Sequence, residues 1–178
     1  VLLCSRYPAL DRVRFCNSGT EANLMALTTA LAVTGRKKIL AFNDSYHGGV
    51  IKFPGGSCRL NVPFDFILAD YNDTEGTADM IRQAGDELAA VIVEPILGAG
   101  GNIPGNAEFM TMLRKLTKEI GAVLIYDEVK TARLGPSGMQ GKIEISPDMT
   151  TLGKFIAGGL PTGAFGGRTD IMAHFNPK

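Results

Sequence analysis

Short apolar runs alternate with segments of helical spacing along most of this chain. Residues 38–42, 91–93 and 122–126 have the length and composition of strands, and apolar residues recur at helical intervals over 24–31 and 109–120. Strands that are apolar on both sides need cover on both sides, which is typical of parallel sheets connected by helices. We therefore expect an α/β fold whose mostly parallel sheet carries helices on both faces.

Turn residues mark the borders of these elements. Gly35 and Gly121 are expected to end the two clearest helices. Residues 46–63 contain four glycines and two prolines, which predicts a loop. Weaker patterns predict strands at 13–16 and 64–68 and a helix at 77–88, although Gly85 interrupts that helix.

Composition excludes several classes of protein. Lys+Arg and Asp+Glu number 18 each among 178 residues, so no net charge favours nucleic acid or an anionic membrane. No apolar stretch is long enough to span a bilayer. The three cysteines form no C-x-x-C pair and the two histidines no H-E-x-x-H motif, so we expect reduced thiols and no metal site.

The segment Asn17-Ser18-Gly19-Thr20-Glu21 joins a predicted strand to a predicted helix. Ser18 and Glu21 have the spacing of a capping box, which by itself means only a well-capped helix. The alternative is that Ser18, Gly19 and Thr20 also hold a phosphate at the positive end of the helix.

Three further polar features follow predicted strands. Tyr46 and His47 come after residues 38–42, where an aromatic side chain could stack on a planar ring or simply cover the edge of the core. Glu94 ends the run 91–93. Asp127 ends the run 122–126, where it could pair with a cation or cap a neighbouring helix.

The alternation of strand side chains extends the prediction at Asp127. Glu128 should point to the opposite side of the sheet, and Val129 should return to the side of Asp127. Because sites in open α/β sheets lie at the carboxyl ends of the strands, these features should meet at one edge.

Lys154 lies in a glycine-rich turn and is the only charged residue in 149–167. Most lysines are solvated surface charges. We expect this one to lie among apolar groups, which disfavour its ammonium form as Schiff-base chemistry requires. An acid at a strand end and a reactive lysine are the pair that a pyridoxal phosphate (PLP) enzyme needs: the acid keeps the pyridine nitrogen protonated, and the lysine holds the cofactor.

At this point the chain resembles the class III PLP-dependent aminotransferases, in particular the glutamate-1-semialdehyde aminomutase and β-amino-acid (β-phenylalanine-type) branches. Five segments in one order carry the resemblance: Asn17-Ser18-Gly19-Thr20-Glu21-Ala22, Tyr46-His47-Gly48, Val93-Glu94-Pro95, Asp127-Glu128-Val129 and Leu152-Gly153-Lys154. The resemblance implies that residues 1–178 are the central part of a fold type I large domain, without the N-terminal segment and the C-terminal small domain.

The same resemblance implies roles for the candidate residues. Lys154 would form the Schiff base and move the substrate proton, and Asp127 would pair with the pyridine nitrogen. The ring would lie between Tyr46 and Val129, with the phosphate held by Ser18, Gly19 and Thr20. Glu94 and His47 would lie near the site without an assigned role.

Some positions depart from the pattern of the family. Lys130 stands where many members have a Gln that can contact the phenolic oxygen of the cofactor. Leu97 and Ala99 stand where ornithine- and GABA-type members have Gln and Glu, and 131–136 differs from the usual continuation. These differences argue against ornithine- and GABA-type substrates.

The resemblance leaves three functions open. The first is transfer of an amino group from an amino acid, which could be a β-amino acid, to a 2-oxo acid. The second is an aminomutase that moves the amino group within one molecule, and the third is a catalytically incomplete fragment. The resemblance also implies a homodimer in the full-length protein. The expected compartment is the cytoplasm, with organellar targeting left open because an N-terminal segment is expected to be missing.

Overall fold

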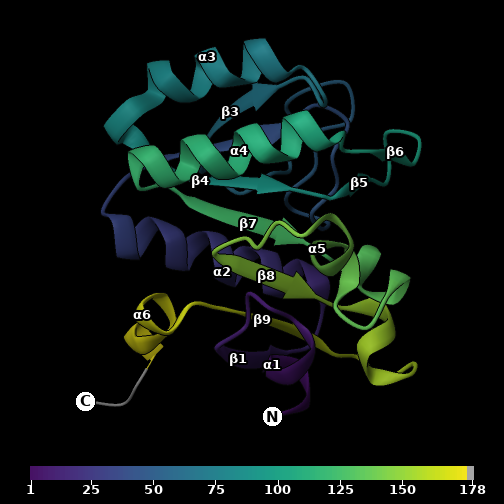
Figure 1. Ribbon diagram of the computed structural model, residues 1–178. Coiled ribbons are helices and arrows are strands. Elements are labelled where there is room, and N and C mark those ends of the chain that lie inside the picture. Colours follow the sequence, from purple (N-terminus) through teal and green to yellow (C-terminus); the bar gives the residue numbers. More distant parts are fainter. Residues whose placement is uncertain (176–178) are drawn as a thin grey trace.

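A computed structural model describes residues 1–175, and a seven-stranded sheet runs through its centre (Figure 1). The strand order is β1-β9-β8-β7-β4-β2-β3. The strands are β1 Arg12–Cys16, β2 Lys38–Phe42, β3 Asp65–Ala69, β4 Leu88–Val93, β7 Val123–Asp127, β8 Met149–Leu152 and β9 Gly163–Gly167. A separate two-stranded hairpin comprises β5 Ile96–Leu97 and β6 Ile103–Pro104.

Strand direction confirms the expectation of a mostly parallel sheet. The neighbours from β3 to β8 pair in parallel, whereas β9 is antiparallel to both β8 and β1. Since β9 separates them, β1 runs in the same direction as the parallel strands. The carboxyl ends of β1, β2, β4, β7 and β8 therefore lie at one edge, as expected for the residues that follow them.

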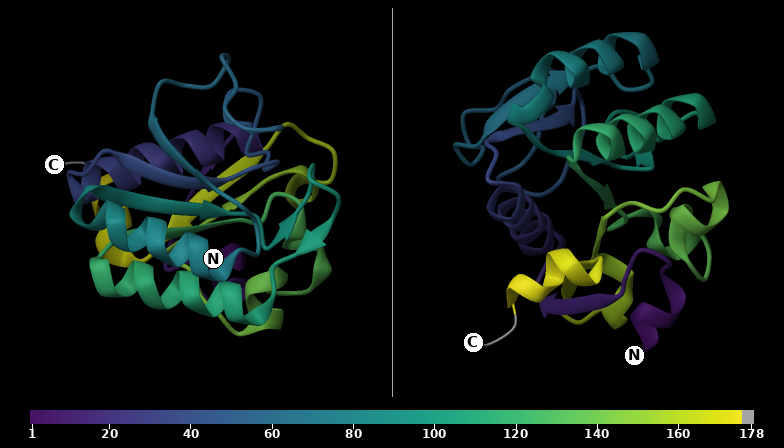
Figure 2. Two further views of the ribbon diagram at one scale, coloured as in Figure 1. Left: turned by 90° about the horizontal axis from the view of Figure 1, so that it is seen from above. Right: turned by 60° about the vertical axis from the view of Figure 1, so that its left-hand side comes forward.

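Helices cover both faces of the sheet, as the apolar strands predicted (Figure 2). Helix α2, Gly19–Thr34, packs on one face, and α3, Thr74–Ala84, and α4, Ala107–Ile120, pack on the other. Shorter helices and turns complete the chain: α1 Leu2–Arg6, η1 Gly85–Glu87, η2 Thr131–Leu134, α5 Gly138–Ile143, η3 Lys154–Ala157, α6 Thr169–Met172 and η4 Ala173–Phe175.

The side chains of β2 alternate between two hydrophobic clusters, one on each face of the sheet. Ile39 and Ala41 belong to the cluster beneath α2, whereas Leu40 and Phe42 belong to the cluster beneath α3 and α4. All four side chains are fully buried. Each inner strand thus contributes apolar area to both layers, which fixes the sheet between the helices.

Glycine ends the predicted helices as expected. Gly35 and Gly121 follow α2 and α4 in the left-handed conformation, with φ of 68° and 69°. The prediction of one helix over 77–88 is wrong at both ends. Helix α3 begins three residues earlier, at Thr74, where the Asp73 side chain accepts a hydrogen bond from the Gly76 amide, and it ends before Gly85.

Strands β8 and β9 were not predicted, and their sequences explain why. β8 carries two threonines among four residues, and β9 is Gly-Ala-Phe-Gly-Gly. A Cβ on Gly163 or Gly166 would lie 2.2 Å from the backbone oxygen of Ser18 or Arg12. Neighbouring backbone therefore comes so close to β9 that glycine is required, which removes the apolar signal of a buried strand.

No helix in the described part of the chain has both the length and the apolar character needed to cross a membrane.

Removing the Leu113 side chain from α4 tests the packing of this layer. Leu113 is fully buried against the sheet, whereas Thr111 on the same helix is exposed. We expect Leu113→Ala to lower the free energy of unfolding in urea by about 2–5 kcal/mol. Thr111→Ala should change it by less than about 0.5 kcal/mol, and equal losses for the two would contradict this packing.

Candidate active site

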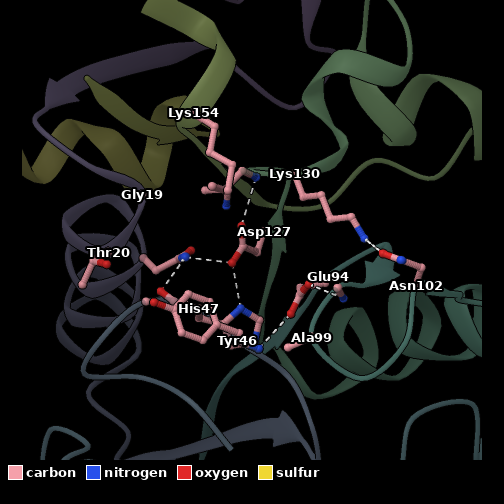
Figure 3. A pocket seen from close by; sticks show the side chains of 14 residues that line it. Gly19, Thr20, Tyr46, His47, Glu94, Ala99, Asn102, Asp127, Lys130 and Lys154 are labelled. Atoms are coloured by element: carbon pink, nitrogen blue, oxygen red, sulfur yellow. Dashed lines mark hydrogen bonds and ion pairs between the residues drawn. The ribbon is translucent and has the colours of Figure 1, made fainter. Parts of the chain in front are cut away.

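A cleft of about 480 Å³ opens at the carboxyl edge of the sheet (Figure 3). Its size is typical of small-molecule sites. Of the nine residues predicted from the sequence, all except Ser18 line it. The lining residues are Gly19, Thr20, Asn23, Tyr46, His47, Gly48, Glu94, Gly98, Ala99, Asn102, Asp127, Val129, Lys130 and Lys154. Segments distant in sequence therefore meet here, as the strand ends predicted.

The Ser18 cap of α2 is confirmed, and the acid of the predicted capping box reaches one residue beyond the amide of the N-cap. Ser18 Oγ accepts a hydrogen bond from the Glu21 amide at 3.1 Å, and the Glu21 carboxylate accepts one from the Asn17 amide at 2.5 Å. Ser18 thus caps the helix beside the cleft. The next residues, Gly19 and Thr20, form part of the wall, and Thr20 Oγ1 accepts from the Gly49 amide at 3.3 Å.

Two glycines allow three chain segments to converge at this wall. A Cβ on Gly19 would lie 2.8 Å from Cγ2 of Val129, closer than real Cβ atoms approach. A Cβ on Gly153 would lie 3.2 Å from Cα of Gly19. The start of α2, the turn after β7 and the turn before Lys154 are therefore in direct contact, and substitution of either glycine would separate them.

Asp127 forms the floor of the cleft and is almost fully buried. Its Oδ2 accepts from Asn23 Nδ2 and lies next to His47 Nδ1, at 2.8 Å each, and its Oδ1 accepts from the Val129 amide at 3.0 Å. Three donors thus compensate for burying the carboxylate. Of these partners, the sequence analysis had placed His47 and Val129 at or near the site.

Asn23 and Thr151 are functional candidates that the sequence reasoning missed. Thr151 Oγ1 donates to Asn23 Oδ1 at 2.6 Å, and both side chains are buried. The available signal was an asparagine among the alanines and leucines of the buried face of α2. A polar side chain in that position requires a buried partner, and the partner lies on β8, a strand that was not predicted.

Glu94 joins two loops of the cleft. Its Oε1 accepts from the Tyr46 amide at 2.8 Å, and its Oε2 accepts from the Gly98 amide at 2.7 Å. Burial raises the pKa of Glu94, and the charge of Asp127 acts in the same direction, while His47 and the two amides oppose the shift. Glu94 therefore holds the loop that carries Tyr46, which is 47% exposed, beside the Gly98 loop.

Glu128 points away from the cleft, as the strand alternation predicted. It is fully buried and accepts hydrogen bonds from Thr131 Oγ1 at 2.6 Å, the Met139 amide at 2.8 Å and the Gln140 amide at 2.9 Å. Consecutive acids of one motif thus have separate tasks. Asp127 faces the cleft, and Glu128 organises the segment that follows it.

Lys154 enters the cleft from the turn after β8, and Figure 3 shows its side chain reaching inward. The expectation that it lies among apolar groups is wrong, because Lys154 and its neighbour Phe155 are exposed. Lys154 has a left-handed backbone with φ of 51°. For a non-glycine residue this conformation costs about 1–3 kcal/mol, and such strain clusters at functional sites.

Lys130 is a second lysine of the cleft, and its Nζ donates to Asn102 Oδ1 in the loop between β5 and β6 (Figure 3). The cleft thus combines two amines with the carboxylates of Glu94 and Asp127. Ala99, one of the positions at which the chain departs from the family pattern, also lines the cleft.

Comparison with known proteins places this geometry in a family. The model of aminotransferase class III matches residues 2–178. The chain belongs to the class III aminotransferase family. The resemblance to this family that the sequence indicated is thus confirmed.

Individual relatives of this class III chain include two enzymes. It is 51% identical over 177 residues to the β-phenylalanine transaminase of Variovorax paradoxus, covering 99% of the chain and 41% of that protein. It is 44% identical over 191 residues to the glutamate-1-semialdehyde 2,1-aminomutase of Alkaliphilus metalliredigens, covering 99% of the chain and 43% of that protein. The chain therefore spans less than half the length of these relatives.

Solved structures of PLP-dependent transaminases confirm the fold, and the chain corresponds to part of their large domain. That of a β-phenylalanine aminotransferase from Variovorax paradoxus matches with a TM-score of 0.97 and 51% identity, covering 99% of this chain and 41% of that one. A structure described as a transaminase with PLP bound matches with a TM-score of 0.90 and 33% identity, covering 99% and 45%.

The contact between Gly19 and Val129 provides a test of the converging segments. We expect Gly19→Ala to destabilise the chain by about 1–3 kcal/mol in urea unfolding, because the new methyl group overlaps the Val129 side chain. Adding Val129→Ala should recover part of that loss. Gly49→Ala, where a Cβ meets nothing within 4 Å, is the matched control and should stay near wild type.

Glu94 provides a test by pH. A raised pKa in the folded state means that folding favours the protonated acid. This contribution to stability is complete below the ordinary value of 4.5 and is lost as pH rises through the higher folded value. Compared with Glu94→Gln, the wild type should therefore lose stability as the pH rises above 4.5 and through the higher folded pKa of Glu94.

Urea unfolding of both proteins across this range measures the difference, and subtraction removes the contributions of other titrating groups. A constant difference between wild type and Glu94→Gln would contradict the effect of burial on this carboxyl.

Proposed function

We propose that this chain is the cofactor-binding core of a PLP-dependent aminotransferase. The observation that carries the proposal is the cleft itself, where Asp127 lies buried with donors on both oxygens and the Lys154 side chain enters from the opposite turn. Asp127 can accept a cation beside its free acceptor direction, and Lys154 supplies a primary amine. A pyridine ring with an aldehyde substituent satisfies both.

The residues of the cleft fit PLP in composition and order. Asp127 would pair with the protonated ring nitrogen, and Val129 and Tyr46 would pack against the faces of the ring. Ser18, Gly19 and Thr20 would hold the phosphate at the positive end of α2, a helix of 16 residues. When bound, PLP supplies an electron sink for the pair of electrons released at the substrate carbon.

Within this arrangement, Lys154 has two tasks. Its Nζ would hold the cofactor covalently until an amino substrate replaces it. The freed amine would then remove the proton from the substrate carbon that carries the nitrogen, and return a proton to the cofactor carbon on the other side of that nitrogen. Entry from an exposed turn suits this role, since the side chain keeps the freedom to move between the two positions.

We propose amino acids and 2-oxo acids as substrates, with a β-amino acid as the donor. Family membership supports the general class, and 51% identity to a β-phenylalanine transaminase supports the donor. The apolar residues Leu97 and Ala99 agree with this choice, because they add no charge to the Gly98 loop beside the cleft.

An aminomutase is the second candidate, favoured by 44% identity to a glutamate-1-semialdehyde 2,1-aminomutase. The same lysine and aspartate would serve both reactions. Product analysis without an added oxo acid separates them, because only the mutase completes a turnover with one substrate.

We further propose that these residues are the central part of the large domain of a longer, homodimeric protein in the cytoplasm. Relatives more than twice as long support the first statement. The three cysteines, which are unpaired, fit a reducing compartment. A catalytically incomplete fragment is the remaining alternative, and it predicts PLP binding without turnover.

Borohydride reduction in the presence of PLP tests the proposal directly. We expect peptide mapping to find the reduced cofactor on Lys154, and Lys154→Ala to remove both the label and the turnover. Lys130→Ala, which removes the other amine of the cleft, should keep the label on Lys154. Equal labelling of surface lysines, or full turnover by Lys154→Ala, would overturn the assignment.

A further inference from the structure

Asn23 occupies an unusual place for an amide side chain. It lies on the sheet-facing side of α2, where its neighbours on the same face are Ala22, Ala26 and Leu27, and only 1% of its surface is exposed. Burying an amide among apolar groups costs free energy unless every donor and acceptor is used. The position of Asn23 therefore requires specific partners.

Those partners fix which way the amide points. The backbone oxygen of His47 can only accept, and it lies 2.9 Å from the Asn23 nitrogen. The same nitrogen lies 2.8 Å from Oδ2 of Asp127. On the other side, Thr151 Oγ1 lies 2.6 Å from the Asn23 oxygen and donates its proton there. A reversed amide would place its oxygen against two acceptors, so this orientation is locked.

The locked amide determines how Asp127 presents its charge. Each carboxylate oxygen has about two acceptor directions. Oδ2 uses both, for Asn23 and His47, whereas Oδ1 uses one, for the Val129 amide. The acceptor direction that remains for a bound group belongs to Oδ1.

His47 agrees with this assignment. Its Nδ1 lies 2.8 Å from the carboxylate and therefore carries a proton, while its buried Nε2 has no partner among the described residues. The Nδ1 proton thus occupies the second acceptor direction of Oδ2 and leaves the free direction on Oδ1.

We propose that Asn23, locked by Thr151, is a positioning residue that holds Asp127 with Oδ1 directed to the ring nitrogen of the cofactor. The proposal rests on the proposed function, because only a bound cationic ring uses that oxygen. Asn23 acts through Asp127 and has no chemical step of its own. Thr151 acts one residue further away, through the amide of Asn23.

The test uses Asn23→Leu, which keeps the shape and removes the donor, in the PLP-loaded protein. Because a hydrogen bond to a charged group contributes enough free energy to change an equilibrium constant about tenfold, we expect the Kd for PLP to rise by at least roughly tenfold. We also expect a shift in the pH midpoint of the visible absorption of bound PLP, because the orientation of Asp127 affects the protonation of the ring.

Variants of β8 separate positioning from packing. Thr151→Val should shift the absorption profile in the same direction, and Thr151→Ser, which keeps the hydroxyl, should restore it. Thr150→Val is the matched control. Its hydroxyl is equally buried but bonds Gln140 on the opposite face of the sheet, so this variant should lose stability without a shift.

The outcomes are distinguishable. Labelling of Lys154 in the wild type with an unchanged affinity and absorption profile in Asn23→Leu would overturn the role of Asn23 alone. Equal shifts in Thr150→Val and Thr151→Val would reduce the effect to packing and also overturn it. Failure of the wild type to bind PLP at Lys154 would overturn both this role and the proposed function. If Asn23→Leu does not fold, the comparison between the two threonine variants decides.

Discussion

The burial of one negative charge organises the cleft. Asp127 ends β7, an inner strand whose side chains are buried on both faces, and it keeps its place because donors arrive from separate parts of the chain. Asn23 comes from a helix, His47 from a loop, and the Val129 amide from the turn that follows. Each of these segments is in turn positioned by the parallel sheet. The fold therefore brings together the groups that make a buried carboxylate tolerable.

Three acids at the ends of the neighbouring strands β4 and β7 have distinct structural roles. Glu94 follows β4 and ties together two loops through their amides, and Glu128 follows Asp127 and holds the segment up to Gln140. Asp127 and Glu94 line the cleft, whereas Glu128 points away from it. The three side chains are chemically alike. Their roles differ because strand alternation points them in different directions and because different donors surround each carboxylate.

Much of this arrangement could be predicted from the sequence. The apolar runs identified β2, β4 and β7, and the capping residues and glycines identified α2 and α4, because these elements depend on local patterns. Eight of the nine site residues line the cleft since they follow parallel strands or begin a helix. What could not be predicted depends on long-range contacts. β9 has lost its apolar pattern to backbone crowding, Asn23 has its meaning only opposite Thr151, and the exposure of Lys154 depends on the turn that carries it.

The antiparallel strand β9 has a consequence for how the chain reaches its native state. It lies between β1 and β8, so Arg12 pairs with Gly167 and Cys16 with Gly163, nearly the whole chain apart. During synthesis β1 emerges well before its partner and leaves its hydrogen-bonding edge open until β9 arrives. Such non-local pairing slows folding and exposes an unpaired strand to other chains. The edge that carries the start of α2 is thus completed late, and the newly made protein is most prone to aggregate before that closure.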